Sequence, residues 1–160
     1  MRCKAFIGLG ANLDAPRVQV LRAFEELAQL EKSTLVARSS LWRSAPLGHA
    51  DQPEFVNAVA ELSTGLPAAI LLAKLHTIEA AHARERSFPN APRTLDLDLL
   101  LFGDEVRSSP DLTLPHARMH ERAFVLKPLI EIAPDTVIPG RGPAGACLLS
   151  LPDQHCERMQ

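Results

Sequence analysis

Two aspartates, Asp96 and Asp98, stand two residues apart in a stretch that is otherwise rich in leucine. Alternate side chains of a β-strand share a face, so both carboxylates are predicted to point one way while Leu95, Leu97 and Leu99 point the other. Along a strand their separation is about 6.6 Å, at roughly 3.3 Å per residue. This spacing predicts that the two carboxylates supply part of the ligands for one or two small divalent cations. Two cations about 3.5–4 Å apart suit phosphoryl transfer.

The same pattern has a simpler interpretation as the solvated face of an antiparallel sheet with leucines packed beneath it. Aspartate is disfavoured in strands, and two carboxylates on one face repel each other, which weakens this interpretation. Nearby arginines favour the interpretation as a metal site for phosphoryl transfer, because guanidinium groups make planar, bidentate contacts with phosphate oxygens. These arginines are Arg84, Arg86 and Arg93.

The composition narrows the class of protein. A chain of 160 residues suits one compact domain that can bury a core. The formal net charge of -2 argues against a broad basic surface for nucleic acid. Three cysteines without a recognisable framework fit a reducing compartment, so we expect a cytoplasmic location. No apolar run approaches the roughly 20 residues that cross a bilayer, and we expect a soluble monomer without a membrane partner.

Periodicity predicts the elements that must position the aspartates. Strands are predicted over 4–9, 34–43, 55–62 and 95–102, and helices over 16–30 and 68–83. On the third strand, the side that carries Val56 and Ala58 is predicted to be the buried one. The residues from Gly8 to Leu13 are predicted to form a turn, and Phe102 to Glu105 a hairpin turn.

Strand, helix, strand, strand, helix, strand is the ferredoxin-like order. We therefore expect an α+β fold with a ferredoxin-like βαββαβ core, in which the helices pack on the faces of an antiparallel sheet. The segment 112–133 is predicted to hold a loop and a short helix broken near Pro128. Residues 1–160 are expected to form a single domain, with a core over about 4–138 and a poorly defined tail over 139–160.

Several motifs converge on one family. They are the turn after the first strand, the loop Ala45-Pro46-Leu47-Gly48 leading to Phe55-Val56-Asn57, and the run Pro92-Arg93-Thr94-Leu95-Asp96-Leu97-Asp98. Together with Leu114-Pro115-His116 and Arg122-Ala123-Phe124, they make the chain resemble the 6-hydroxymethyl-7,8-dihydropterin pyrophosphokinases of folate biosynthesis. The resemblance implies magnesium-dependent transfer of diphosphate from ATP to the hydroxymethyl group of a reduced pterin, with AMP as the other product.

The resemblance also implies roles for individual residues. Asp96 and Asp98 would ligate two magnesium ions, and Arg84 and Arg93 would act with them in catalysis. Nucleotide contacts are implied for Glu79, Arg84, Arg93, Thr113, His116 and Arg122. Pterin contacts are implied for Ser44, Ala45, Leu47, Phe55, Asn57 and Phe124, where two aromatic rings would sandwich the flat heterocycle. Asn57 would offer a donor and an acceptor to the amide edge of the pterin.

Some positions depart from the family pattern. Asn90-Ala91 stands where many relatives have Trp-Gly, and the loop before Pro92 is about one residue shorter, so Phe88 is a candidate to replace the missing indole. Ala117 stands where an aromatic residue often follows the histidine, and His76 where relatives often have glutamine.

Two other classes of function remain open from the residues alone. A metal-dependent phosphodiesterase or nuclease would use the same two aspartates to activate water and would need no pterin pocket. A ligand-binding or RNA-binding module on a ferredoxin-like sheet would leave the acidic pair merely exposed and would need a basic patch. No Gly-x-x-x-x-Gly-Lys motif occurs, which argues against a P-loop kinase. The residues also leave open which group takes the proton of the substrate hydroxyl group. Either Asp98 takes this proton, or the proton is lost without a dedicated base.

Overall fold

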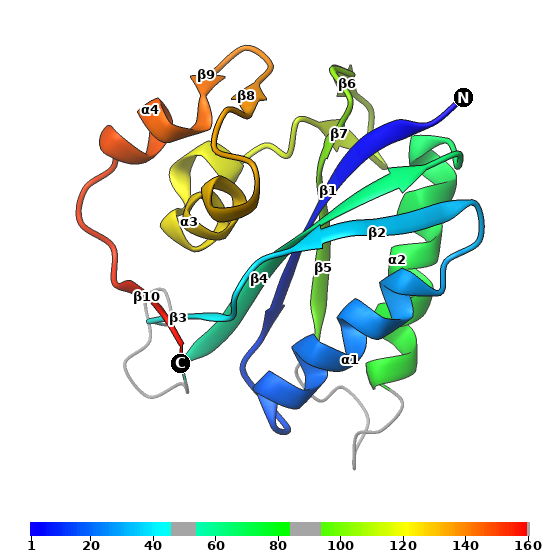
Figure 1. The fold of residues 1–160 in the computed structure, drawn as a ribbon, viewed down its shortest axis with the longest axis horizontal. Helices are drawn as coiled ribbons and strands as arrows, with labels where there is room; N and C mark the ends of the chain where they lie inside the picture. The colour runs from blue at the N-terminus through cyan, green and yellow to red at the C-terminus, as the bar shows by residue number, and fades with distance from the viewer. Residues whose placement is uncertain (46–53, 84–93, 160) are drawn as a thin grey trace.

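The computed structural model describes residues 1–45, 54–83 and 94–159 (Figure 1). The main strands are β1 (Cys3–Ala11), β2 (Ser33–Arg38), β3 (Trp42–Ser44), β4 (Phe55–Thr64), β5 (Asp96–Phe102) and β10 (Cys156–Arg158). The helices are α1 (Pro16–Ala28), α2 (Ala68–Ala83), α3 (Ala123–Ile132), α4 (Ala144–Leu149) and the short 3-10 helix η1 (Met119–Glu121). Two small ribbons pair β6 (Arg107–Ser108) with β7 (Thr113–Leu114), and β8 (Val137–Ile138) with β9 (Gly142–Pro143).

The main sheet has the order β10-β3-β4-β1-β5, and β2 also pairs with β4. All of its strand pairs are antiparallel, with β1 and β4 at the centre and β5 on the other side of β1. Since α1 follows β1 and α2 follows β4, the connectivity is the ferredoxin-like order that the sequence predicts. The predicted α+β fold class is confirmed.

The predicted strand over 34–43 is two strands, β2 and β3, which pair with successive parts of β4. The ladder is interrupted at Ser39, whose hydroxyl accepts a hydrogen bond from Val59 N at 2.9 Å. This hydroxyl also donates to Ser40 O at 2.7 Å, so side-chain bonds replace part of the backbone ladder. The strand therefore bends here, and β3 continues along the first residues of β4, Phe55 to Asn57.

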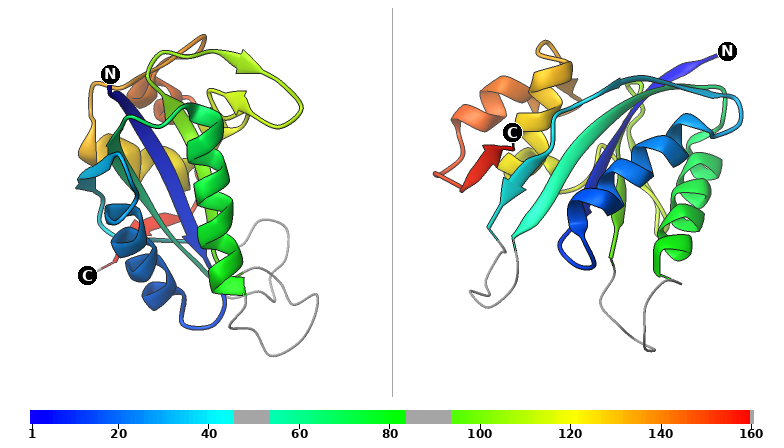
Figure 2. Two further views of the ribbon diagram at one scale, coloured as in Figure 1. Left: turned by 90° about the vertical axis from the view of Figure 1, so that its right-hand side faces the viewer. Right: turned by 60° about the horizontal axis from the view of Figure 1, so that its bottom comes forward.

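Helices cover both faces of the sheet (Figure 2). The helices α1 and α2 pack on one face over the larger apolar core, whereas α3 packs against β4 on the other face. The prediction for β4 is therefore correct for Val56 and Ala58 but incomplete, because Asn57 and Val59 on the opposite side are buried as well. Their cover comes from α3, which lies far along the chain and leaves no local signal in β4.

Two further local predictions are wrong. The helix α3 runs through Pro128 without a break, since Leu126 and Leu129 beside it are fully buried and their packing outweighs one missing backbone bond. The turn after Phe102 exists, with Gly103 at a φ of 54°, but β6 pairs with β7 and forms no hairpin with β5. Across the described ranges, none of the helices has the length and apolar character required to cross a bilayer.

Candidate active site

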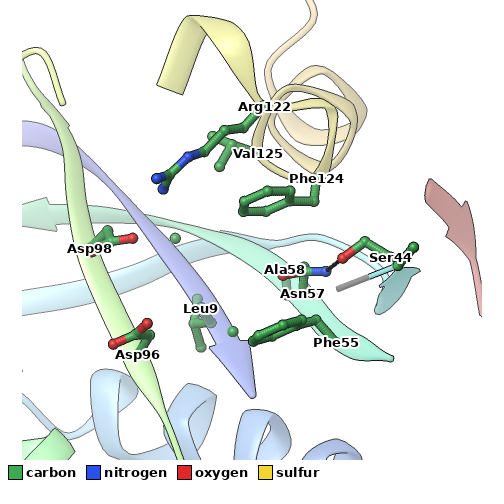
Figure 3. A pocket seen from close by; sticks show the side chains of 13 residues that line it. Leu9, Ser44, Phe55, Asn57, Ala58, Asp96, Asp98, Arg122, Phe124 and Val125 are labelled. Carbon is green, nitrogen blue, oxygen red and sulfur yellow. Dashed lines mark hydrogen bonds between the residues drawn. The ribbon is translucent and has the colours of Figure 1, made fainter. Parts of the chain in front are cut away.

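Asp96 and Asp98 lie on β5 with their carboxylates on the same side of the sheet, as strand alternation predicts (Figure 3). The neighbouring Leu95, Leu97 and Leu99 are buried on the opposite side, in the core beneath α1 and α2. The carboxylates are partly exposed and face α3 across an open space. The acidic pair is therefore the edge of a cleft and not a solvated sheet face.

Glycines form the floor beside the acidic pair. Gly8 lies opposite Asp98 and Gly10 opposite Asp96, because β1 continues to Ala11 where the sequence predicts a turn. A Cβ atom on Gly10 would lie 3.4 Å from Asn57 Oδ1. The bare backbone thus leaves a flat surface between the carboxylates and the side chains of β4.

Glu79 on α2 supports the backbone between the two aspartates. Its Oε2 accepts a hydrogen bond from Leu97 N at 2.8 Å. Since β5 is an edge strand of the sheet, this carboxylate satisfies an amide that has no neighbouring strand on that side. The bond links Glu79 to the acidic pair directly, a relation that no sequence motif reveals.

A pocket of about 300 Å³, here called the ring pocket, lies over this floor. Phe55 from β4 and Phe124 from α3 present their rings to it from opposite sides (Figure 3). Asn57 is buried between them and donates from Nδ2 to Ser44 Oγ at 2.7 Å, which fixes the amide. The lining residues are Gly8, Leu9, Gly10, Ser44, Ala45, Phe55, Asn57, Ala58, Asp96, Asp98, Arg122, Phe124 and Val125.

A second cavity of about 510 Å³, here called the polar pocket, lies on the other side of the aspartates. It is lined by Leu72, His76, Glu79, Asp96, Leu97, Asp98, Leu99, Asp111, Leu112, Thr113, His116, Ala117 and Arg122. Asp96, Asp98 and Arg122 line both pockets. The two carboxylates and one guanidinium group therefore form the boundary at which two different ligands could meet.

His116 stands in the polar pocket as a neutral donor. Burial lowers the pKa of its imidazole, Asp98 opposes this shift, and the cations Arg122 and Arg118 add to it. Its Nδ1 accepts a hydrogen bond from Arg118 N at 3.2 Å, so the neutral ring carries its proton on Nε2. A neutral imidazole of this tautomer can donate a hydrogen bond to an oxygen of a ligand.

Arg122 connects the two pockets. Its guanidinium lies over the Phe124 ring at 5.6 Å from the ring centroid, a cation–π contact that restrains a long side chain. Figure 3 shows the side chain extending from α3 into the space between Phe124 and Asp98. Arg122 therefore places a positive charge close to the acidic pair. An anion bound to cations on Asp96 and Asp98 would lie beside this charge.

The structure brings most of the predicted site residues together. Ser44, Ala45, Phe55, Asn57 and Phe124 line the ring pocket, Glu79, Thr113 and His116 line the polar pocket, and Asp96, Asp98 and Arg122 line both. Leu47, Arg84 and Arg93 lie outside the described residues, as do Arg86 and Phe88. Sequence reasoning missed Gly8, Gly10, Asp111 and Val125; the two alternate glycines at the end of the first strand were the available signal.

The acidic pair fits a magnesium site of the kind that is completed by a ligand. Within residues 1–45, 54–83 and 94–159, no group of three or more His, Cys, Asp or Glu side chains is placed to hold a metal ion. Magnesium in proteins is commonly held by one or two carboxylates, with waters and phosphate oxygens as the other ligands. Two carboxylates beside an open polar pocket meet that requirement.

Comparison with known proteins gives consistent matches. The model of the family described as 7,8-dihydro-6-hydroxymethylpterin-pyrophosphokinase (HPPK) matches residues 6–134. A Pseudomonas aeruginosa protein named 2-amino-4-hydroxy-6-hydroxymethyldihydropteridine pyrophosphokinase is 44% identical over 156 residues, covering 98% of this chain and 96% of that protein. A Haemophilus influenzae protein of the same name is 47% identical over 135 residues, covering 84% of each chain.

Solved structures share the fold at low sequence identity. A structure of an HPPK-DHPS in complex with substrates has a TM-score of 0.73 and 11% identity, and the match covers 93% of this chain and 43% of that one. A Plasmodium falciparum HPPK-DHPS triple mutant has a TM-score of 0.74 and 12% identity, with the same coverage. The chain thus corresponds to less than half of these longer proteins.

Proposed function

Because this chain belongs to the 7,8-dihydro-6-hydroxymethylpterin-pyrophosphokinase family, we propose that its two pockets hold the two substrates of that reaction on either side of Asp96 and Asp98. The chain is a pyrophosphokinase of folate biosynthesis that uses ATP as co-substrate. The sharing of Asp96, Asp98 and Arg122 between the pockets carries the assignment of sites, since it brings an acceptor and a diphosphate donor to one boundary.

The ring pocket is the site for the reduced pterin. Two phenyl rings facing each other across a cavity of about 300 Å³ suit a flat bicyclic heterocycle, which would stack between Phe55 and Phe124. Asn57 is buried and held by Ser44, so its remaining donor and acceptor capacity meets the amide edge of the pterin in one orientation. This orientation directs the hydroxymethyl group toward the aspartates.

The polar pocket is the site for ATP. The neutral His116 donates from Nε2, Arg122 supplies a permanent positive charge, and Thr113 offers a hydroxyl group. Family resemblance also assigns phosphate contacts to Arg84 and Arg93, which stay predictions. Glu79 supports this site from behind through its bond to Leu97 N, in addition to the nucleotide contact that the resemblance implies.

Asp96 and Asp98 would hold two magnesium ions. When bound, these ions would neutralise the triphosphate and align it for attack. Catalysis of this kind depends mainly on positioning and charge stabilisation, so the chain's contribution is to hold both substrates at one boundary and to add the charge of Arg122.

The transfer itself joins two substrates in one step. The hydroxyl oxygen of the pterin forms a bond to the β-phosphorus of ATP, and the bond from that phosphorus to the bridging oxygen of the α-phosphate breaks. AMP leaves with the electron pair of that bond. The hydroxyl proton passes to Asp98 or to solvent. A phosphodiesterase using the same aspartates would have no use for paired phenyl rings and a fixed Asn57, which favours the pyrophosphokinase assignment.

The nucleotide product tests this proposal. The purified protein with magnesium, ATP and 6-hydroxymethyl-7,8-dihydropterin is expected to form AMP and the pterin diphosphate in equal amounts, separated by anion-exchange chromatography. A pterin with a methyl group in place of the hydroxymethyl group is the control and should give no AMP. ADP as the sole nucleotide product, or AMP formed equally with the control pterin, would remove the assignment.

A further inference from the structure

The C-terminal segment 154–159 contacts both walls of the ring pocket, although it lies beyond the residues 6–134 that match the family. We propose that this segment is a positioning element for the pterin, and that Gln154 is the residue through which it holds Arg122 and Phe124 in place. The inference rests on the proposed function, because it assumes that the ring pocket binds the pterin.

Gln154 fixes the backbone on both sides of Arg122. Its Oε1 accepts a hydrogen bond from Ala123 N at 2.9 Å, and its Nε2 donates to Glu121 O at 3.0 Å. One side-chain amide thus spans the junction between η1 and α3. Phe124 is the next residue along the helix, so the same contact fixes the backbone position from which its side chain extends.

The start of α3 needs this contact because it has no local cap. Arg122 occupies the N-cap position in an extended conformation, and its side chain makes no capping hydrogen bond. Arginine is not among the residues that cap helices well, and uncapped amides in the first turn destabilise it. Gln154 supplies the missing acceptor from 31 residues away in the chain.

The same segment holds the opposite wall. The strand β10 pairs with β3, with Cys156 opposite Ser44, and Met159 N donates to Leu41 O at 2.8 Å. Since β3 has only three residues, a partner on each side gives it support that a short edge strand lacks. Ser44 in turn accepts the bond from Asn57, so β10 supports the polar contact of the pocket.

A lysine ties the two walls together. Lys127 on α3 donates from Nζ to Cys156 O at 2.9 Å, which joins the helix to β10. The segment therefore bridges β3 and α3, the two elements that carry Ser44 and Phe124. Ser44 pairs with Phe55 of β4, so the bridge also sets the position of Phe55 relative to Phe124. Because the gap between these two rings must match the thickness of a flat heterocycle, a bridge of fixed length favours pterin binding more than nucleotide binding. Arg122 lines both pockets, but Glu79, Thr113 and His116 of the polar pocket lie on or beside other elements, so the nucleotide is expected to depend less on the segment than the pterin does.

The variant Gln154→Leu tests the inference in the full chain, since it keeps side-chain bulk and removes both hydrogen bonds. Asp153→Ala, at the exposed neighbouring residue, is the matched control. Pterin affinity is measured by titration in the presence of magnesium and a nonhydrolysable ATP analogue, and affinity for the analogue is measured separately by calorimetry. Loss of two hydrogen bonds predicts a pterin Kd raised about tenfold, an analogue Kd changed less than about threefold, and no effect of the control.

Equal losses for pterin and nucleotide, or no loss for either, would overturn the inference, because a merely structural role affects both sites alike. Gln154→Glu is the conservative variant: it keeps the acceptor for Ala123 N and places a negative charge at a helix N-terminus, so it is expected to recover most of the pterin affinity. It also carries the test if Gln154→Leu does not fold, and then a loss of pterin affinity no larger than the loss of nucleotide affinity would again overturn the inference. Wild-type protein that binds the analogue but no pterin would overturn the proposed function and this inference together.

Discussion

The two pockets that meet at the acidic pair are built in different ways. The ring pocket is the smaller, about 300 Å³ against about 510 Å³, and its key side chains are fixed by the protein itself: Asn57 is bonded to Ser44, and Phe124 follows a helix start held by Gln154. The polar pocket is lined instead by groups that offer charge or hydrogen bonds, such as His116 and Arg122. A rigid flat ligand gains from preorganised walls, whereas a flexible polyanion gains from charge, so each pocket matches the substrate assigned to it.

Removal of either shared carboxylate gives the largest expected effect, because it affects the boundary of both pockets. Asp96→Ala and Asp98→Ala are each expected to lower turnover by at least about a thousandfold, since charge stabilisation of the phosphates is lost. Asp104→Ala, at an exposed aspartate in the turn after β5, is the control and should leave turnover unchanged. Near-normal turnover in either site variant, with the fold verified by circular dichroism, would contradict the metal role.

Phe124→Ala should affect binding in the ring pocket much more than binding in the polar pocket. Loss of ring stacking and of buried apolar area is expected to raise the KM for the pterin about thirtyfold, with the KM for ATP changed less than about threefold. Phe124→Leu keeps apolar bulk and should lose clearly less pterin affinity. Steady-state kinetics with each substrate varied in turn measures the split. A KM for ATP that rises as much as that for the pterin would show that the pockets are not independent.

His116→Ala should give the opposite split. The neutral imidazole donates from Nε2 into the polar pocket, so its loss is expected to raise the KM for ATP about tenfold and to leave the KM for the pterin within about twofold. Asp104→Ala, at an exposed residue outside both pockets, is again the control. If His116→Ala raised the KM for the pterin and left the KM for ATP unchanged, the assignment of the polar pocket to the nucleotide would be contradicted.

Glu131→Gln should produce the smallest effect, on stability and not on either KM. The Glu131 carboxylate accepts bonds from Ser40 N at 3.0 Å, Ser40 Oγ at 2.6 Å and Trp42 Nε1 at 2.9 Å, and so holds α3 to the start of β3. Burial acts to raise its pKa, but these hydrogen bonds and the nearby Arg158 outweigh burial, and the pKa of Glu131 lies below its ordinary value of 4.5.

The sign of the pH dependence follows from this shift. Because the folded protein binds this proton less readily than the unfolded chain, the stabilisation is complete above pH 4.5 and is lost as the pH falls through the lowered pKa. Urea unfolding of Glu131→Gln should therefore show a loss of stability below pH 4.5 that is shallower than in the wild type. A variant whose stability falls as steeply as the wild type over this range would show that Glu131 does not contribute. The group is mostly exposed, so solvent screening keeps the effect at neutral pH below about 1 kcal/mol.

Some of the site could be predicted from the sequence because its causes are local. The shared face of Asp96 and Asp98 follows from strand alternation, and the order of six core elements follows from hydrophobic period. Other features depend on residues far apart in the chain. The cover that α3 gives to Val59, and the capping of that helix by Gln154, leave no pattern in either segment.

Two of the wrong predictions of secondary structure have physical causes of the same kind. The break between β2 and β3 depends on the Ser39 hydroxyl competing for Val59 N, which periodicity does not register. The helix at Pro128 continues because buried neighbours outweigh the missing amide, and burial on that face was itself unknown from the sequence. The described residues that the family resemblance implies for the site nevertheless line the two pockets.

Whether Asp96 and Asp98 serve both pockets at once is tested most directly by replacing magnesium with Mn²⁺ and measuring nuclear relaxation. In a complex with the pterin and a nonhydrolysable ATP analogue, Mn²⁺ is expected to broaden both the hydroxymethyl protons of the pterin and the phosphorus signals of the analogue. Asp98→Ala should weaken the broadening of the pterin protons, whereas the phosphorus signals stay broad because phosphate oxygens bind Mn²⁺ themselves. Broadening of the phosphorus signals alone, with sharp pterin resonances while the pterin is bound, would contradict a shared boundary.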